Sequence, residues 1–360
     1  MPSNNLAILS CAGSGKTSEI VSLAGDATGR SLLLTYTRNN TQTIRDRFYT
    51  KYGYIPPHCD IDTWYSFLLS HFVRPYQRHF RVERIAEIAW IQGKSTKGVP
   101  RSNTGRYYFS PQGRIYRDKV SDFGVACNVA SGGSPITRLA QIYSAVYIDE
   151  FQDLAAWDLE IVELLLRSGI HTAIVGDHRQ HTYRTNDSPK HKQYEGEGIL
   201  QLINKWQDEG LCKTQPRNEN RRGCQPICDF ADYVFPHTHR MTSIEVPPTG
   251  HDGIFLVTRA SVGAYRAQFS PMILRWDRKT DCDGYEAMNF GESKGLSFDR
   301  VLIYPNKPIR DFLEKNDTRK IKNARAKLYV GVTRARYSVA FVLDGTCRVP
   351  DVTQFTKTRI

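Results

Sequence analysis

The chain has 360 residues, 40% of them hydrophobic, and a formal net charge of +12. This length and composition are enough for two domains with buried cores. The positive charge makes a polyanion the first partner to consider, although many basic proteins bind no nucleic acid. The sequence contains no apolar run near the roughly 20 residues that cross a bilayer. Its start has no signal-peptide pattern, so we expect a cytoplasmic protein without a membrane partner.

The first predicted element is a short apolar strand at 6–9, followed by a glycine-rich turn and a helix at 18–24. The turn consists of Ala12, Gly13, Ser14, Gly15, Lys16 and Thr17. This order of elements is the context of a phosphate-binding loop, in which backbone N–H groups and the positive end of the helix face an anion. Lys16 would reach the β- and γ-phosphates, and the Thr17 hydroxyl would bind Mg²⁺. The alternative is a surface turn, which seldom carries Gly-Lys-Thr between a strand and a helix.

Strands and helices continue to alternate after this loop. Residues 30–36 read as a buried strand, 37–49 as a helix, and 60–69 as the end of a strand that leads into another helix. Such alternation predicts an α/β fold with a parallel sheet. Ligands of parallel sheets bind at the carboxyl ends of the strands, which is where the predicted phosphate loop lies.

Residues 72–120 have a different composition from the rest of the chain. They hold eleven lysines and arginines against three acids, a net charge of +8, with aromatic residues between them. Cations that neutralise phosphates, beside aromatics that stack on bases, are typical of a surface that binds single strands. The alternative, which we weigh equally, is a solvated basic insertion whose aromatics form a small core. We expect some of each.

Two later strands lead into polar residues that could complete a nucleotide site. The strand at 144–148 is followed by Asp149 and Glu150, and the strand at 171–176 is followed by Gln180. Asp149 would hold Mg²⁺, and Glu150 would orient and deprotonate the attacking water. Gln180 would sense the γ-phosphate.

The second half of the chain contains the signals of another α/β domain, and we expect the first domain to end near residue 212. Predicted strands lie at 253–258, 272–276, 301–304 and 338–343, and predicted helices at 227–235 and 326–336.

One group of residues raises the possibility of a zinc site. It consists of Cys212, Cys224, Cys228, His237 and His239. The group contains no Cys-x-x-Cys pair, which structural zinc sites commonly use. Buried, reduced thiols are therefore the default expectation.

The order of the motifs resembles that of the UvrD/Rep/PcrA-like DNA helicases of superfamily one. Residues 12–17 resemble motif I, 35–38 motif Ia, 63–67 the next DNA-contacting motif, 149–153 motif II, 176–180 with Tyr183 and Arg184 motif III, 220–222 motif IV, 293–298 motif V, and 329–336 motif VI. Asp-Glu-Phe-Gln-Asp at 149–153 and Val-Thr-Arg-Ala-Arg at 332–336 are the most specific of these matches.

The resemblance implies two RecA-like P-loop NTPase domains with parallel sheets, ATP and Mg²⁺ in the cleft between them, and single-stranded DNA as partner. The first domain would comprise 1–71 and 135–212, a reduced basic insertion 72–134, and the second domain 213–360. The resemblance also implies roles for individual residues. Catalysis would involve Glu150, Gln180, Arg222 and Arg334, the last two as arginine fingers, and nucleotide binding would involve Arg221 and Gly295 beside the phosphate loop. The metal would be held by Thr17 and Asp149, and DNA would be contacted by Thr35, Arg38, Thr63, Trp64, Tyr183 and Arg184. For Trp64, core packing is an equal alternative.

The departures from the family pattern concern the base and the duplex. Because the first predicted strand begins almost at once after Met1, we expect the family's glutamine-bearing segment that reads adenine to be absent. Ser18 stands where an arginine commonly stacks on the base, and Arg221 where a tyrosine does, which leaves ATP against GTP open. The space between motifs IV and V is too short for the large second insertion, so the resemblance is to a short form of the family.

The resemblance therefore implies an ATP-dependent DNA helicase or a single-stranded-DNA translocase with 3′→5′ polarity, in DNA repair or antiphage defence. The alternative is a regulatory NTPase subunit that switches a partner nuclease, by analogy with the helicase-like partners of OLD-family nucleases. A third reading, a basic binding module with a vestigial ATPase, conflicts with the intact set of catalytic residues.

Overall fold

The computed structural model describes residues 4–91, 93–182, 188–244 and 246–356. The chain forms two compact units. Unit 1 comprises Met1–Leu9, Lys16–His178 and Tyr183–Gln215, and unit 2 comprises Ser10–Gly15, Arg179–Thr182 and Pro216–Ile360. The main segment of unit 2 begins at Pro216, and unit 2 also includes two short segments from the first half of the chain. Among the described residues, every helix is too short or too polar to cross a membrane.

A six-stranded sheet forms the centre of unit 1. Its order is β3-β2-β6-β7-β1-β8, and the pairings from β3 through to β1 are parallel. The strands are β1 (Leu6–Ser10), β2 (Ser31–Thr35), β3 (Cys59–Thr63), β6 (Ala145–Ile148), β7 (His171–Gly176) and β8 (Lys213–Arg217). Because neighbouring strands run in the same direction, the ends of β1, β2, β6 and β7 lie at one edge of the sheet. The residues expected to bind nucleotide follow β1, β6 and β7.

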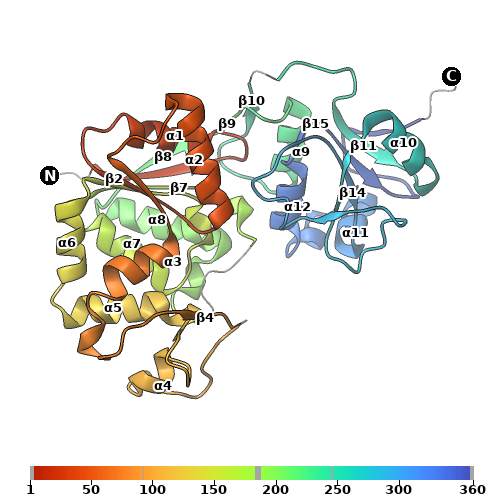
Figure 1. The fold of residues 1–360 in the computed structure, drawn as a ribbon. Helices are drawn as coiled ribbons and strands as arrows, with labels where there is room; N and C mark the ends of the chain where they lie inside the picture. The colour runs from red at the N-terminus through yellow and green to blue at the C-terminus, as the bar shows by residue number, and fades with distance from the viewer. Residues whose placement is uncertain (1–3, 92, 183–187, 245, 357–360) are drawn as a thin grey trace. The chain divides into compact units, whose positions relative to one another are not determined.

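Helices cover both faces of this sheet, which explains why its strands are almost continuously apolar. Leu33 packs toward α1 (Lys16–Gly25) and α2 (Arg38–Tyr52). Leu32 and Leu34 pack toward the other face, which is covered by α3 (Trp64–Phe67), α5 (Val120–Ala130), α6 (Ser134–Ile142), α7 (Trp157–Leu166) and α8 (Ile199–Asp208). Figure 1 shows α1 and α2 on one side of the strands and α7 and α8 on the other.

The insertion expected at 72–134 has no separate core. It contains the small pair β4 (Ile88–Ala89) and β5 (Ile115–Tyr116) and the helix α4 (Thr104–Tyr108). Tyr108 and Phe109 pack against Phe123 of α5 at centroid distances of 4.9 and 5.3 Å. These rings belong to the same apolar cluster as Leu32 and Leu34 of the main sheet. The insertion therefore continues the core of unit 1. Some of its aromatic residues are structural, but they do not form the separate small core that one of the two alternatives described.

Unit 2 contains a second six-stranded sheet in the order β13-β12-β14-β15-β11-β16, and every pairing in it is parallel. Its strands are β11 (Gly253–Val257), β12 (Met272–Arg275), β13 (Met288–Asn289), β14 (Phe298–Tyr304), β15 (Ala335–Val342) and β16 (Val352–Gln354). One face is covered by α9 (Gln225–Val234), α11 (Lys307–Lys315) and α12 (Arg325–Val332), and the other by α10 (Val262–Phe269). Two α/β units with six-stranded parallel sheets confirm the predicted RecA-like fold class.

The helix predicted at 326–336 is shorter than expected. It ends at Val332, and Ala335 already belongs to β15. The run Ala335–Val342 pairs with β11 on one side and β14 on the other, so the ladder in the middle of the sheet overrides helical propensity there. Thr333 and Arg334 consequently lie in the turn between helix and strand.

Candidate active site

The glycine-rich turn after β1 contains two glycines in the left-handed backbone region. Gly13 and Gly15 have φ values of +76° and +83°, which a residue with a side chain rarely adopts. A Cβ at Gly13 would lie 2.5 Å from Oδ1 of Asn220, so this contact also requires glycine. The ten-residue helix α1 begins at Lys16, and its first N–H groups and positive end are available to an anion. The Ser14 hydroxyl is buried and, among the described residues, has no hydrogen-bond partner, so it could form a hydrogen bond to a ligand bound in the loop.

Thr17 and Asp149 come together within unit 1. The Thr17 hydroxyl donates to Oδ2 of Asp149 at 2.9 Å, and Asp149 is 4% exposed. Burial and the charge of Glu150 raise the pKa of Asp149 to about 6, while Lys16 and the Thr17 hydrogen bond oppose the rise. A hydroxyl beside carboxylates is the hard-oxygen ligand set that Mg²⁺ prefers, and a cation there would stabilise the charged carboxylate. The residues present therefore fit the expected metal.

Glu150 is held by a neighbour that the sequence did not single out. It has φ +54° and occupies the left-handed region, which for a non-glycine residue is a strained conformation typical of functional sites. The Gln152 amide donates to the Glu150 carboxylate and accepts the N–H of Asp177 at 3.0 Å. A Cβ at Gly176 would lie 2.3 Å from the Gln152 side-chain oxygen. The end of β7 thus fixes Gln152, and Gln152 orients Glu150.

Unit 2 brings Gln180 and Arg334 together. Arg334 is 1% exposed, and its guanidinium donates to the carbonyl oxygens of Val330 and Leu296 at 3.0 and 3.2 Å. It also donates to the side-chain oxygen of Gln180 at 3.3 Å. The Nζ of Lys294 donates to the Gln180 carbonyl at 3.3 Å. The predicted γ-phosphate sensor and one predicted arginine finger are therefore direct hydrogen-bond partners.

Arg222, the second predicted arginine finger, packs against the phosphate loop segment of unit 2. Its N–H donates to Asn220 at 2.7 Å, and its guanidinium donates to the Thr333 carbonyl at 3.1 Å. The Arg221 N–H donates to the Gly13 carbonyl at 3.0 Å, while the Arg221 side chain is exposed. Gly295 is also exposed and has φ +86°, so it serves a turn before β14.

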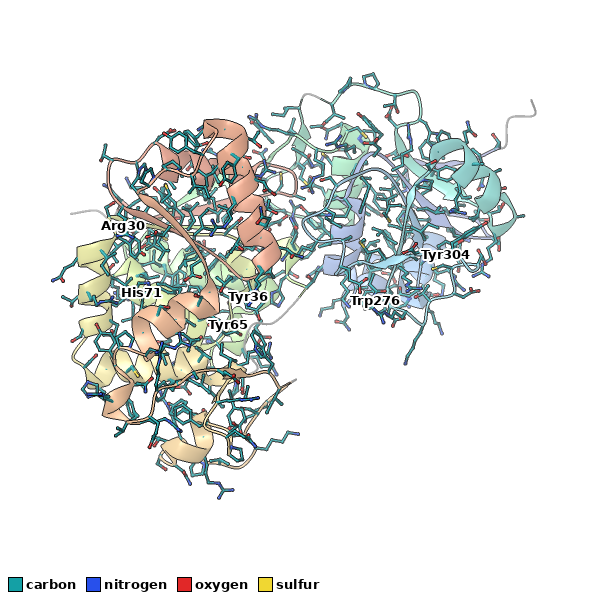
Figure 2. All side chains as sticks on the ribbon, viewed as in Figure 1. Arg30, Tyr36, Tyr65, His71, Trp276 and Tyr304 are labelled. Atoms are coloured by element: carbon teal, nitrogen blue, oxygen red, sulfur yellow. The ribbon has the colours of Figure 1, made fainter. Side chains whose placement is uncertain are left out.

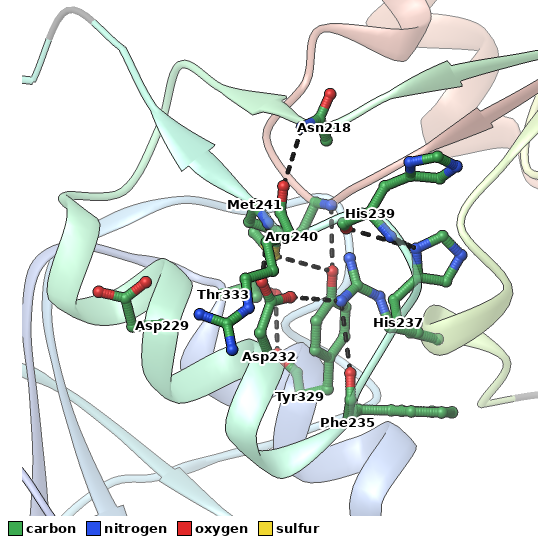
Figure 3. Close-up of polar contacts among 12 residues, drawn as sticks. Asn218, Asp229, Asp232, Phe235, His237, His239, Arg240, Met241, Tyr329 and Thr333 are labelled. Carbon is green, nitrogen blue, oxygen red and sulfur yellow. Dashed lines mark hydrogen bonds and ion pairs between the residues drawn. The ribbon is translucent and has the colours of Figure 1, made fainter.

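A buried polar network in unit 2 holds both of its segments from the first half of the chain. Figure 3 shows two of its members, Asp232 and Tyr329. The Ala12 N–H donates to the Tyr329 hydroxyl at 3.2 Å. The Arg179 guanidinium lies 4.5 Å from the centre of the Tyr329 ring and pairs with Asp232 at 2.7 Å. Arg179 is 2% exposed. We did not single out Arg179, Asp232 or Tyr329 for roles from the sequence, although Arg179 precedes Gln180 and Tyr329 opens the motif at 329–336.

Burial argues against a DNA contact for Thr35, and for Trp64 it favours core packing, which was the equal alternative. Thr35 and Trp64 are each 1% exposed. The Trp64 indole N–H donates to the buried Asp158 at 2.7 Å, so its ring belongs to the core and no base can stack on it. Strand β2 is interior on both sides, which covers Thr35.

The remaining predicted DNA contacts have mixed positions. Arg38 is exposed at the start of α2. The Thr63 hydroxyl accepts the N–H of Ser66 at 3.3 Å and caps α3. Tyr183 and Arg184 lie outside the described residues.

The cysteines weighed as zinc ligands are apolar packing groups. Cys224 and Cys228 are 8% and 0% exposed, and burial raises the pKa of both thiols. Cys212 lies in the core of unit 1. Among the described residues, no three histidine, cysteine, aspartate or glutamate side chains lie close enough together to form a zinc site.

Comparison with known proteins extends the sequence evidence. Residues 125–194 match the family model of the UvrD/REP helicase N-terminal domain. That segment contains the Asp149–Glu150 pair and Gln180. No curated protein matches the chain.

Solved helicases from arteriviruses are among the similar structures. Arterivirus nonstructural protein 10 has a TM-score of 0.49 at 11% identity, over 94% of this chain and 59% of that one. The complex of the same protein with DNA has a TM-score of 0.49 at 12% identity, over 95% of this chain and 61% of that one. The PRRSV helicase has a TM-score of 0.45 at 15% identity, over 96% of this chain and 55% of that one. The chain thus spans little more than half of the length of these proteins.

Proposed function

We propose that the chain is an ATP-dependent motor on single-stranded DNA, a helicase or translocase with 3′→5′ polarity. The observation that carries this proposal is the hydrogen bond between Thr17 and Asp149. Lys16 precedes Thr17 in the sequence, and Glu150 follows Asp149. The proposal is supported by the glycine conformations of the phosphate loop and by the match of residues 125–194 to a helicase domain model.

Each residue of the site has a physical role in the proposed reaction. Lys16 and the N–H groups at the start of α1 would bind the phosphates of ATP. Thr17 and Asp149 would hold Mg²⁺, which when bound offsets the negative charge of the phosphates. Glu150, oriented by Gln152, would accept a proton from the attacking water.

Arg222, Arg334 and Gln180 would stabilise the transition state. Guanidinium groups that approach the transferring phosphoryl group neutralise the charge that develops on its oxygens. Gln180 would pass the state of the γ-phosphate to Arg334, because the two side chains are hydrogen-bonded at 3.3 Å. Hydrolysis would thereby be tied to a change in unit 2.

The test is the ATPase rate with and without single-stranded DNA. We expect strong stimulation of the wild type by single strands. Glu150→Gln removes the general base but keeps the shape of the side chain, so we expect a fall in kcat of about 10²–10⁴-fold with nucleotide binding retained. Asp208→Asn, the same acid-to-amide change at an exposed position of α8, is the matched control and should leave the rate unchanged.

Three outcomes would contradict the proposal. If the purified wild type binds no nucleotide, the role of Lys16 is wrong. If Glu150→Gln hydrolyses ATP like Asp208→Asn, Glu150 is not the base. If only a protein partner stimulates hydrolysis, the regulatory NTPase becomes the better description.

A further inference from the structure

Trp90 is an exposed tryptophan in the basic insertion. It follows β4 and is 68% exposed, and the next residue, Ile91, is 44% exposed. Tryptophan is the largest apolar side chain, and a folded protein normally covers it. These two adjacent exposed apolar side chains are a candidate contact point for a ligand.

Trp90 packs against a tyrosine, Tyr65, that is itself in contact with a second one, Tyr36. Its ring contacts Tyr65 edge to face at a centroid distance of 5.6 Å and an angle of 86°. Tyr65 in turn contacts Tyr36 at 5.6 Å, and the two tyrosines lie close together in Figure 2. Tyr65 is 7% exposed, so Tyr65 is a buried packing partner and the Trp90 ring is the one accessible to a ligand.

This row of rings lies at the edge of the sheet where the strands end. Tyr36 directly follows β2, and Tyr65 comes two residues after the end of β3. The contact with Tyr65 brings Trp90 of the insertion to the same edge. The exposed Arg38 at the start of α2 is two residues from Tyr36.

The charge around Trp90 favours a polyanion over an apolar protein surface. Residues 72–120 carry a net charge of +8. Within the part of the chain that the structure describes, Arg84, Lys94 and Lys97 are exposed and form no ion pair with an acid. An open indole among cations that have no acidic partner is the composition that holds a single strand, through stacking and phosphate neutralisation together.

We propose that Trp90 is the base-stacking residue of this protein, and that Tyr65 and Tyr36 hold its indole ready for a base of single-stranded DNA. The role rests on the proposed function. It replaces the role first expected for Trp64, whose ring is buried. The basic insertion thereby contributes to the surface that binds single-stranded DNA.

The experiment measures the binding of two fluorescently labelled oligonucleotides of equal length by anisotropy at fixed salt. One oligonucleotide is polythymidine, and the other has abasic sites throughout. Trp90→Ala should weaken binding of polythymidine about tenfold or more, the effect of removing one stacked aromatic. On the abasic strand, which offers phosphates and no bases, Trp90→Ala and wild type should bind equally.

Two matched variants separate stacking from other effects. Trp90→Phe keeps an aromatic face and should retain most of the affinity for polythymidine. Val82→Ala trims another exposed apolar side chain of the insertion, 76% exposed, and should change nothing. Val82→Ala, which has no proposed role in binding, should also leave the DNA-free ATPase rate unchanged. The unfolding temperature should be the same for all variants, because neither side chain is buried.

The results distinguish failure of this inference from failure of the proposed function. If wild type binds polythymidine and Trp90→Ala binds it equally well, Trp90 does not stack on a base. If Trp90→Ala weakens both oligonucleotides to the same extent, Trp90 has only a structural role. If wild type binds neither oligonucleotide even at low salt, the proposed function itself fails, and the role of Trp90 with it.

Discussion

At the scale of single residues, Arg179 is a buried cation whose guanidinium has both an acidic and an aromatic partner. It is 2% exposed, donates to Asp232 at 2.7 Å and lies over the ring of Tyr329. Asp232 also accepts the N–H of Met241 at 2.7 Å. A buried charge of this kind is tolerated only because it is paired and hydrogen-bonded. The pair holds the backbone that leads directly into Gln180.

We expect Arg179→Ala to destabilise the protein by about 3–5 kcal/mol, because it leaves the Asp232 carboxylate in a largely buried position without its charge partner. Denaturant titration of the purified variant measures the effect. Arg240→Ala removes an exposed arginine from the same region (Figure 3), and its free energy of unfolding should stay within about 0.5 kcal/mol of that of the wild type. Equal stability of the two variants would show that the Arg179–Asp232 pair is not structural.

At the scale of elements, α12 carries much of the second unit's functional geometry. The helix contains Tyr329 and leads directly into the turn that holds Arg334. Its position depends on a close contact with Phe290, which is fully buried. A Cβ at Gly331 would lie 2.6 Å from two atoms of that ring. Glycine is therefore needed here for space, although glycine weakens a helix elsewhere.

Gly331→Ala should destabilise unit 2 by about 1–3 kcal/mol, since the added methyl overpacks the contact with Phe290. Gly105→Ala in α4 is the matched control, because a Cβ at that position would have no other atom within 4 Å and its φ is negative. That change should be neutral or stabilise by up to about 1 kcal/mol. Urea-induced unfolding gives both values, and the same sign for the two variants would contradict the packing argument.

At the scale of the whole molecule, the positive charge is unevenly distributed. The full chain carries +12, and residues 72–120 alone carry +8. Part of this charge is structural, because Arg101 pairs with the buried Asp122 and Arg114 with Glu87. The exposed cations without an acidic partner are those that can neutralise phosphates.

We expect the triple variant Arg84→Ala, Lys94→Ala, Lys97→Ala to flatten the salt dependence of single-strand binding. Each phosphate that is no longer neutralised should reduce the slope of log Kobs against log salt by about 0.7. Binding measured across a salt series tests this. The control removes three exposed cations from unit 2, Lys307, Arg310 and Lys320, and so lowers the net charge equally. If both triples change the slope alike, binding follows the total charge and not the insertion.

The sequence alone was sufficient to predict the fold class and the pairing of Thr17 with Asp149. Both depend on local signals, namely the alternation of strands and helices and the polar residues that follow parallel strands. These residues meet because parallel strands end at one edge of the sheet. The order of motifs along the chain carries the resemblance for the same reason: it is a property of the sequence and needs no contact to be known.

Only the tertiary structure decided which side chains are buried and which are exposed. Trp64 and Trp90 are the same residue type, but the first faces Asp158 in the core and the second faces solvent beyond Tyr65. Arg179 and Asp232 are 53 positions apart, and no local pattern pairs them. The end of α12 at Val332 was likewise fixed by the sheet that Ala335 joins. Burial and long-range pairing depend on how the elements pack, and packing is set by the whole chain.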